Sequence, residues 1–447
     1  HVRSRRQRQM CIRDRVYDVN GLSRTKKEPS PNLNWVQTDL FSYTCTQKAL
    51  EGTDIAIYLV HSMLPSSRLF QGSFQDTDLL LADNFAKACK RNGVKQVIYL
   101  GGLVPESGES KHLVSRKEVE DVFKASDVPV TILRAGLVVG AGGSSFEILN
   151  NLVHNLPGMI LPLWTQRNTQ AIYVDDLISV IFHSINNEGF LGKTINVVNG
   201  QAITYAQLIK ETATYVGSNM LMIAVPINYT SFSKLWVKIF GQADYELVSP
   251  LIDSLLCDLP TPKISKEIES IIKYREYKAM LINIPKKKKV KRKSKPNIEI
   301  NNVRSIQRLS NFSQLNHEQL SEKFISWLPK YLRFLITAKW DRNLLKFNAI
   351  GLKYPLLILE KDDSINYLDR SKFQIVGGLL SKSEASGWLE FRIVSNKKHA
   401  LASINEFIPS LPWYIYKITQ APLHAFIMHK FSAVSYTQLT LPTTPYV

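Results

Sequence analysis

Two side chains in the segment HLVSRKEVE, residues 112–120, could perform acid–base chemistry together. An imidazole such as that of His112 titrates at about pH 6.5, so it can donate or accept a proton near neutral pH. Arg116 follows four residues later, and its positive charge favours the neutral form of the imidazole. Arg116 cannot give up its own proton, but it can bind ribose hydroxyls or an anionic substrate. The pair predicts proton transfer beside a bound substrate.

Strand-like and helix-like segments alternate around this pair. Short apolar runs rich in β-branched residues suit strands buried on both faces, and they cover residues 54–60, 95–102, 128–136 and 194–200. Helical patterns lie at 76–93, 115–126 and 175–187. Such alternation predicts an α/β fold with a doubly wound parallel sheet.

The order of these segments resembles the short-chain dehydrogenase/reductase superfamily, in its extended and atypical branches. The matching motifs lie between residues 21 and 208 and read, in order, GLSR, WVQTDL, YLVHS, GVKQVIYLGG, ILRAGLVVG, AIYVDDL and GKTINVVNGQAITYAQL. More narrowly, the chain is similar to nucleoside-diphosphate-sugar-epimerase-like proteins with an extra C-terminal domain of unknown function. The resemblance implies a Rossmann-like sheet, NADP or else NAD as cofactor, and a small-molecule substrate.

The resemblance also implies cofactor contacts at strand ends. Arg24 stands where an arginine accommodates the 2′-phosphate of NADP, unless it is only a surface residue. Asp39 stands where the family's aspartate touches adenine, unless it caps the next helix. His61 either faces the cleft or is a hydrogen-bonded structural histidine. The further implied contacts are Val60, Ser62, Gly101, Gly102, Ala135 and Gly136.

The catalytic positions depart from the family pattern. The family's Y-x-x-S-K-x-x-x-E aligns with residues 112–120, so His112 replaces the tyrosine and Arg116 the lysine. The family's serine after the fifth strand is replaced by Gly101 and Gly102. Two functions remain open. One is an NAD(P)-dependent oxidoreductase or epimerase-like enzyme that uses His112, and the other is a non-catalytic NADPH-binding regulator or hydrophobic-ligand carrier.

Several polar residues near the substrate side are interpreted as structural. We expect Ser144 or Ser145 to cap a helix, and Asp175 or Asp176 to cap another. Arg167 could meet an acidic substrate, but a surface position is the simpler interpretation.

The two ends of the chain are related as complementary DNA. One back-translation of residues 5–14 has a reverse complement that encodes VSYTHLTLPT, and residues 434–443 read VSYTQLTLPT. We therefore predict that residues 1–15 and 434–447 are translated sequencing adapter. The family's first strand and its G-x-x-G-x-x-G turn should precede Gly21, and residues 1–20 contain neither. We expect a truncated chain whose sheet lacks its first strand and binds dinucleotide poorly.

The net charge of +18 is concentrated in two segments. Residues 1–15 carry six arginines and one aspartate, and residues 285–296 carry eight lysines and arginines, which leaves +5 for the rest. The second segment resembles a nuclear-import signal, but a basic run between apolar-rich regions is typical of a linker, here residues 285–300. With the adapter excluded, the charge no longer predicts a nucleic-acid partner.

Residues 16–217 are predicted as the Rossmann domain, 218–284 as helices over its substrate side, and 301–433 as an α+β domain. In the last domain, strand-like runs follow a helical segment and end in an aromatic helix at 411–431. This order resembles helix-grip, lipid-transfer-like domains, which implies a cavity for a hydrophobic ligand unless the aromatic residues are simply core. Its aromatic and basic residues could also contact a membrane surface.

The four cysteines show neither C-x-x-C nor Cys/His ligand spacing, which predicts reduced thiols, no metal site and a cytoplasmic location. No apolar run is long enough for a membrane span. Nothing in the sequence indicates an oligomeric state.

Overall fold

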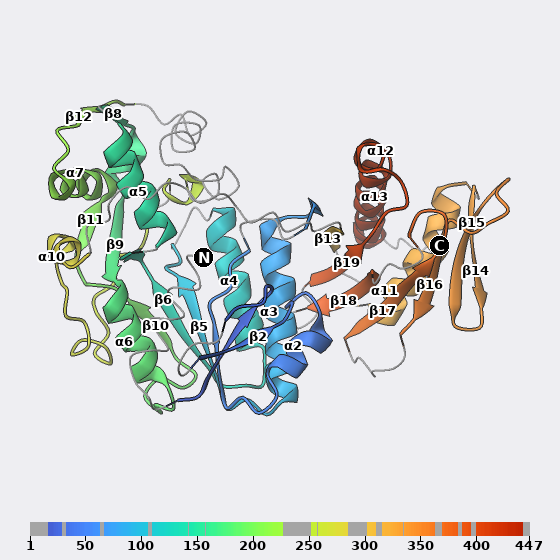
Figure 1. The fold of residues 1–447 in the computed structure, drawn as a ribbon, viewed down its shortest axis with the longest axis horizontal. Coiled ribbons are helices and arrows are strands. Elements are labelled where there is room, and N and C mark those ends of the chain that lie inside the picture. Colours follow the sequence, from blue (N-terminus) through green and yellow to red (C-terminus); the bar gives the residue numbers. More distant parts are fainter. Residues whose placement is uncertain are drawn as a thin grey trace, which may run out of the picture. The chain divides into compact units, whose positions relative to one another are not determined.

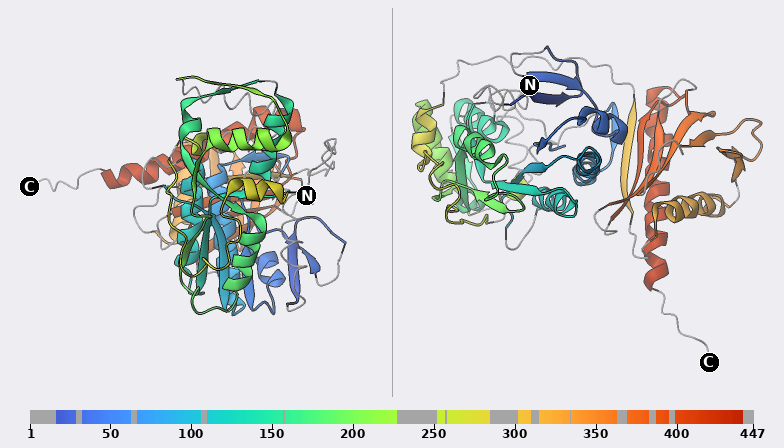
Figure 2. Two further views of the ribbon diagram at one scale, coloured as in Figure 1. Left: turned by 90° about the vertical axis from the view of Figure 1, so that its left-hand side faces the viewer. Right: turned by 90° about the horizontal axis from the view of Figure 1, so that it is seen from below.

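The structure, a computed structural model, divides into two units (Figures 1 and 2). Unit 1 comprises His1–Met63 and Asn84–Lys293, and unit 2 comprises Leu64–Asp83 and Ser294–Val447. The predicted basic linker and the predicted N-terminal adapter lie outside the described residues. The residues that the structure describes are 17–28, 33–62, 67–105, 110–141, 143–156, 158–226, 252–256, 258–284, 302–309, 315–333, 335–362, 369–382, 387–394 and 399–440.

A four-stranded parallel sheet forms the centre of unit 1 (Figure 1). Its order is β10 (Thr194–Val197), β6 (Val130–Ala135), β5 (Gln96–Gly102) and β3 (Ile55–Tyr58). Every one of these strands falls within a run predicted as strand from its β-branched composition. Parallel neighbours need a crossover connection, which α4 (Lys111–Lys124) supplies between β5 and β6. The predicted α/β fold with a parallel sheet is confirmed.

The two faces of this sheet bury different side chains because successive strand residues point in opposite directions. Tyr99 of β5 points to the face where Tyr58, Phe85 of α3 (Phe74–Arg91) and Phe123 of α4 form an aromatic cluster. Ile98 points to the opposite face, in a core shared with α6 (Val174–Ser184). Side chains are buried on both faces of the sheet, as the continuous apolar composition of the strands predicted.

A second parallel pair, β1 (Val19–Ser23) and β2 (Leu33–Gln37), forms its own sheet. In the described residues β3 is an edge of the four-stranded sheet and has no ladder to β1. The Rossmann strand order places a first strand between these two positions. In the described residues no strand occupies this position.

The predicted substrate side of unit 1 combines small sheets and helices. One sheet has the order β11 (Ala202–Thr204), β9 (Asn168–Tyr173), β7 (Leu137–Val139), and another pairs β12 (Leu221–Ala224) with β8 (Gly158–Leu161). The helices here are α5 (Ser144–Asn155), η1 (Leu163–Gln166), α7 (Tyr205–Val216) and α10 (Tyr277–Ile282). Helix α2 (Tyr43–Ala49) lies elsewhere in unit 1, beside α3 and β2 (Figure 1). Residues 218–284 were predicted as helices, but their described part contains β12 and long irregular stretches as well as α10.

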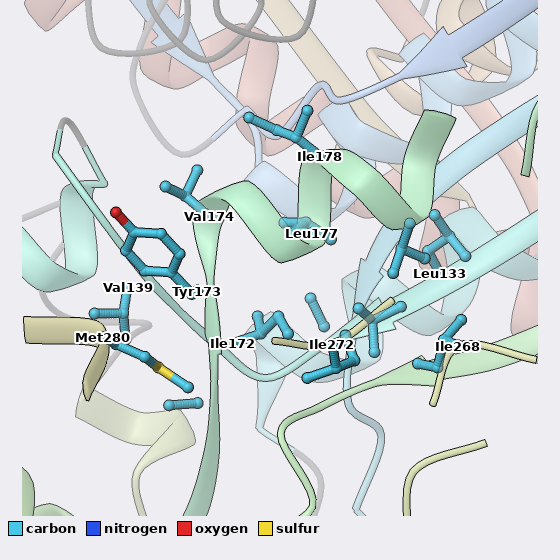
Figure 3. Packing of buried hydrophobic residues seen from close by; sticks show 14 of the residues in the cluster. Leu133, Val139, Ile172, Tyr173, Val174, Leu177, Ile178, Ile268, Ile272 and Met280 are labelled. Carbon is cyan, nitrogen blue, oxygen red and sulfur yellow. The ribbon is translucent and has the colours of Figure 1, made fainter. Parts of the chain in front are cut away.

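Figure 3 shows the main core of unit 1, where α6 and β9 meet a segment that comes much later in the chain. Ile172 and Leu177 pack with Ile268, Ile272 and Met280. Residues 258–284 therefore belong to the folded body of unit 1.

Both serines and both aspartates predicted as helix caps take other positions. The N-cap of α5 is Gly143, so Ser144 and Ser145 already lie in the helix. The N-cap of α6 is Tyr173, and neither Asp175 nor Asp176 caps the helix. Asp176 instead accepts hydrogen bonds from the backbone N–H groups of Lys273 and Tyr274, at 3.1 and 3.0 Å. Burial raises its pKa against these bonds, so this carboxyl holds the late segment onto α6.

Unit 2 contains one eight-stranded sheet with helices on it (Figure 2). Its order is β14 (Ile336–Asp341), β15 (Leu344–Ala349), β16 (Leu357–Lys361), β17 (Arg370–Gly377), β18 (Trp388–Val394), β19 (His399–Phe407), β13 (Val303–Leu309) and β4 (Leu69–Gln71). All pairs are antiparallel except β13 with β4. The predicted sheet-rich C-terminal domain is confirmed, whereas the strand β4, supplied from far upstream, was not predicted.

Helices α11 (His317–Tyr331), α12 (Trp413–Ile418) and α13 (Gln420–Thr440) complete unit 2. One face of the sheet packs on them, and the ring of Phe324 contacts those of Phe391 and Phe431. α13 extends into the segment predicted as C-terminal adapter.

The other face of the sheet buries charged side chains. Arg370 of β17 and Arg392 of β18 are register partners, and both are almost fully buried. Asp83, in the part of α3 that belongs to unit 2, accepts a hydrogen bond from Arg392 at 3.0 Å. Glu390 and Asp369 contribute two further carboxylates to this cluster. Burial alone would lower the pKa of Arg370, but the surrounding carboxylates raise it.

Candidate functional site

The structure brings His61 and His112 into contact at the carboxyl end of the parallel sheet. His61 follows β3, and His112 lies in the first turn of α4. Nε2 of His61 is 3.1 Å from Nδ1 of His112, and the two ring centroids are 4.9 Å apart. His61 is buried and His112 is half-buried. One of these nitrogens donates and the other accepts, so the two rings share one proton.

α4 begins earlier than predicted, which places His112 inside the helix. Residues 115–126 were predicted as helical, whereas α4 spans Lys111–Lys124. Ser110 is the N-cap, and its side chain accepts a hydrogen bond from the backbone N–H of Leu113. This cap stabilises the first turn and fixes the orientation from which His112 projects.

Two contacts fix α4 against the sheet. The Tyr99 hydroxyl of β5 donates to the carbonyl of Arg116 at 3.2 Å. Arg134 of β6 donates two hydrogen bonds to Glu120, at 2.9 and 2.7 Å, and Lys124 donates a third to the same carboxylate. Burial would raise the pKa of Glu120, but the bonds from Arg134 and Lys124 lower it, so Glu120 stays charged. Neither contact was predicted from the sequence.

Arg116 lies one turn after His112 on α4 and is half-buried. Among the described residues it forms no ion pair. Its guanidinium is therefore not neutralised by a carboxylate of the described fold, and it could bind an anionic group near His112.

The residues implied as nucleoside contacts lie at the ends of β1 and β2. Arg24 directly follows β1 and is exposed, and its carbonyl accepts a hydrogen bond from Gln37. Asp39 accepts a hydrogen bond from the backbone N–H of Phe41 at 3.2 Å, just before α2, whose N-cap is Ser42. Asp39 thus shapes the entry to α2, close to the capping role that was its alternative interpretation.

The other implied contacts also lie at the carboxyl ends of the strands. Val60 and Ser62 flank His61 after β3, Gly101 and Gly102 end β5, and Ala135 ends β6. A Cβ on Gly102 would meet no heavy atom within 4 Å, so the serine of the family would fit there. A Cβ on Gly136 would lie 2.1 Å from the carbonyl oxygen of Gln170, so close backbone packing already requires glycine there.

Arg167 forms an ion pair with Asp258 on the surface. Its interpretation as a surface residue is therefore supported by the structure. No group of three or more histidine, cysteine, aspartate or glutamate side chains among the described residues could hold a metal ion.

The described residues fit part of a dinucleotide. Polar and small residues lie at the carboxyl ends of the strands, and Arg24 is exposed directly after β1. A glycine-rich turn that could cradle the pyrophosphate does not occur in the described residues of unit 1. The fold thus offers positions for the nucleosides without the phosphate cradle.

No protein-family model matches the chain. Two curated proteins are similar to part of it. The auxiliary protein GraX of Staphylococcus aureus is 36% identical over 87 residues, which is 20% of this chain and 28% of that protein. A UDP-glucose 4-epimerase of Vibrio cholerae is 27% identical over 203 residues, 40% of this chain and 60% of the epimerase. The chain therefore matches less than two thirds of the length of either relative.

Among solved structures, the triphenylmethane reductase of Citrobacter sp., complexed with NADP(H), has 15% sequence identity and a TM-score of 0.49. The likeness covers 63% of this chain and 95% of the reductase. A likeness at this level does not identify a substrate or a reaction. The epimerase match, with the motifs and the parallel sheet, confirms the resemblance predicted for the N-terminal part of the chain. The predicted resemblance of the C-terminal domain to helix-grip, lipid-transfer-like domains stays a prediction.

Proposed function

We propose that this chain is part of an NAD(P)-dependent oxidoreductase or epimerase-like enzyme for a small molecule, with His112 as its acid–base residue. The observation that carries the proposal is the hydrogen bond between His61 and His112 at the carboxyl end of the parallel sheet. Ligands of open α/β sheets bind at this end, where the strand order reverses. NADP is the proposed cofactor, and the exposed position of Arg24 directly after β1 supports the proposal, because an arginine there could bind a 2′-phosphate.

The His61–His112 pair can support proton transfer in both directions. When His61 donates to Nδ1 of His112, the latter ring carries its proton on Nε2 and can act as an acid. When Nδ1 of His112 donates, Nε2 is a base. When Nε2 of His112 gives its proton to a substrate, the proton on Nε2 of His61 would move to Nδ1 of His112, and Nδ1 of His61 would take up a proton from water, so that both rings stay neutral.

The other residues of the site would bind and orient. Arg116 would bind an anionic substrate group or ribose hydroxyls one turn from His112. The Tyr99 and Glu120 contacts would keep α4 at a fixed distance from β3. A bound nicotinamide would supply hydride transfer, and Arg24, Asp39 and the strand-end residues would contact its dinucleotide.

The test uses a longer form of the protein that includes a glycine-rich turn before Gly21, and it measures NADPH binding by fluorescence and NADPH oxidation with a panel of small carbonyl compounds. We expect His112→Phe to retain NADPH binding and to lower turnover by about a hundredfold or more. The matched control is His154→Phe, an exposed histidine of α5 whose ring contacts only its own helix in the described hydrogen bonds.

Two outcomes would contradict the proposal in different ways. If NADPH binds but His112→Phe turns over every substrate at the wild-type rate, His112 is not the acid. If the protein binds NADPH and no carbonyl compound is reduced, the non-catalytic regulator or ligand carrier is favoured. A protein with its natural upstream sequence that binds no dinucleotide would exclude both.

A further inference from the structure

One end of the sheet in unit 2 carries large apolar side chains that face solvent. β14 and β16 begin at this end, and β15 and β17 finish there, because neighbouring strands run antiparallel. Backbone hydrogen bonds join the connecting segments, from Ile350 to Leu335 and from Leu379 to Pro355, both at 3.0 Å. We call this surface the apolar tip, and its members are Leu335, Ile350, Leu352, Tyr354 and Leu379.

The exposure of the apolar tip is high for side chains of this size. Its five members are between 45% and 69% exposed, whereas Leu345 and Phe347 of the adjoining strand β15 are buried. Gly351 lies between Ile350 and Leu352 with a φ of +80°, a conformation that other residues rarely adopt. The turn thus has a fixed form that directs both neighbours outward. Contiguous exposed apolar surface of this kind marks an interaction site.

The segment before α12 reaches the same end of the sheet. Ser410 donates its backbone N–H to Leu380 at 3.1 Å, and Lys382 donates to Ile408 at 3.2 Å. Tyr414 and Ile418 of α12 are each more than 70% exposed. α12 thus adds exposed apolar side chains just after the segment that is bonded to this end of the sheet.

The charges of this surface have one sign. Arg333, Lys353 and Lys382 are exposed on the segments that form the tip, and Lys417 is exposed on α12. The described residues 331–333, 349–356, 378–382 and 408–419 contain no aspartate or glutamate. Nζ of Lys353 lies over the ring of Tyr354, 5.9 Å from its centroid. Apolar and aromatic side chains interspersed with basic ones match the boundary between anionic headgroups and acyl chains.

We propose that the apolar tip binds peripherally to anionic lipid membranes, with Ile350 and Leu352 inserted and Lys353 among the headgroups. Moving the apolar side chains out of water into the membrane favours binding, and the basic residues are attracted to the negatively charged surface. Among the described residues no helix has the length and apolarity to cross a bilayer, so the proposed contact is with the membrane surface. The proposal does not depend on the proposed enzymatic function.

The test is co-sedimentation of the full chain with vesicles of phosphatidylcholine and phosphatidylserine, and with vesicles of phosphatidylcholine alone. We expect binding to the anionic vesicles that weakens with added salt. The double variant Ile350→Asp/Leu352→Asp should lower partitioning by about tenfold or more. Lys353→Ala should lower it about fivefold.

Ile282→Asp is the matched control, since Ile282 of α10 is 75% exposed but lies in unit 1. It should partition like the wild type, and far-ultraviolet circular dichroism should show that every variant is folded. Failure of the wild type to sediment with anionic vesicles overturns the proposal, as does equal sedimentation of the double variant. A dimer without vesicles that the double variant abolishes would assign the tip to a second copy and also overturn it.

Discussion

Arg134 of β6 and Glu120 of α4 form a bidentate pair, at 2.9 and 2.7 Å, with Glu120 almost fully buried. This pair connects the sheet to the helix that carries His112. Removing Arg134 would leave a buried carboxylate with only Lys124 and a distant Lys117 as partners. We expect Arg134→Leu to lower the free energy of unfolding by about 2–3 kcal/mol, measured by urea denaturation.

The control for this prediction is Lys90→Ala, which breaks the exposed ion pair between Lys90 and Asp127. Such pairs contribute at most about 1 kcal/mol because water and salt screen them. Equal losses for the two variants would show that the buried position of Glu120 has no special importance.

The contact between His61 and His112 can be tested without any knowledge of the substrate. In a double-mutant cycle with His61→Phe and His112→Phe, we expect a coupling free energy of about 1 kcal/mol in urea denaturation. The coupling should be favourable to the folded state, because each single variant already removes the hydrogen bond between the two rings and the second substitution cannot remove it again. Additive single and double variants would mean that the two rings do not interact in solution.

His424 of α13 gives a prediction about acid stability. Burial lowers its pKa to about 4, so the folded state keeps the ring neutral while an unfolded chain takes up a proton at about pH 6.5. The free energy of unfolding therefore has no penalty from His424 above about pH 6.5, and it decreases as the pH falls from there toward 4. His424 is only half-buried by surface area, so we expect a smaller loss than for an enclosed imidazole.

The measurement is the urea concentration at which half of the protein is unfolded, determined at several pH values between about 7 and about 4. His424→Leu should flatten the dependence, and His429→Leu, at an exposed position of the same helix, should not. A profile that His424→Leu leaves unchanged would assign the acid sensitivity to other groups.

Cys89 and Cys45 should differ in reactivity. Cys89 of α3 is fully buried, and burial raises the pKa of its thiol to about 12, whereas Cys45 is exposed on α2. The thiolate is the reactive species, so Cys89 should resist alkylation until the protein unfolds. Iodoacetamide labelling with peptide mass mapping should find Cys45 modified before Cys89. Early labelling of Cys89 would show that α3 opens locally.

The sequence predicted the elements of the site better than their contacts. β3, β5, β6 and β10 were found because apolar β-branched runs bounded by turns are a local signal. His112 and Arg116 were predicted as site residues because their spacing aligned with a family motif, and their roles remain a prediction. The contact of His112 with His61 depends on how β3 and α4 pack, and neither segment carries information about the other.

Long-range pairings were missed for the same reason. Nothing in Leu69–Gln71 indicates that it joins β13, which lies more than two hundred residues later. The cap predictions for Ser144 and Asp176 were wrong. Serine and aspartate are common both at the N-cap and in the first turn of a helix, so the sequence alone does not show which residue is the cap. Arg134 was read only as part of a strand, although a basic residue in a buried strand requires an acidic partner.

The buried cluster around Arg392 provides the most stringent test of unit 2. Arg392 is about 1% exposed and pairs with Asp83 and Glu390, while Arg370 on the neighbouring strand shares both carboxylates. Arg392→Met would leave two buried carboxylates with one arginine between them. We expect the free energy of unfolding of unit 2 to fall by about 3–5 kcal/mol, measured in urea by tryptophan fluorescence.

The control is Lys346→Met, which breaks the surface pair with Asp341 and should change this free energy by less than about 1 kcal/mol. The triple variant Arg392→Met/Asp83→Leu/Glu390→Leu should recover part of the loss, because it removes the unpaired charges together with their partner. If the single and triple variants were equally unstable, packing of the Arg392 side chain rather than charge compensation would account for the effect.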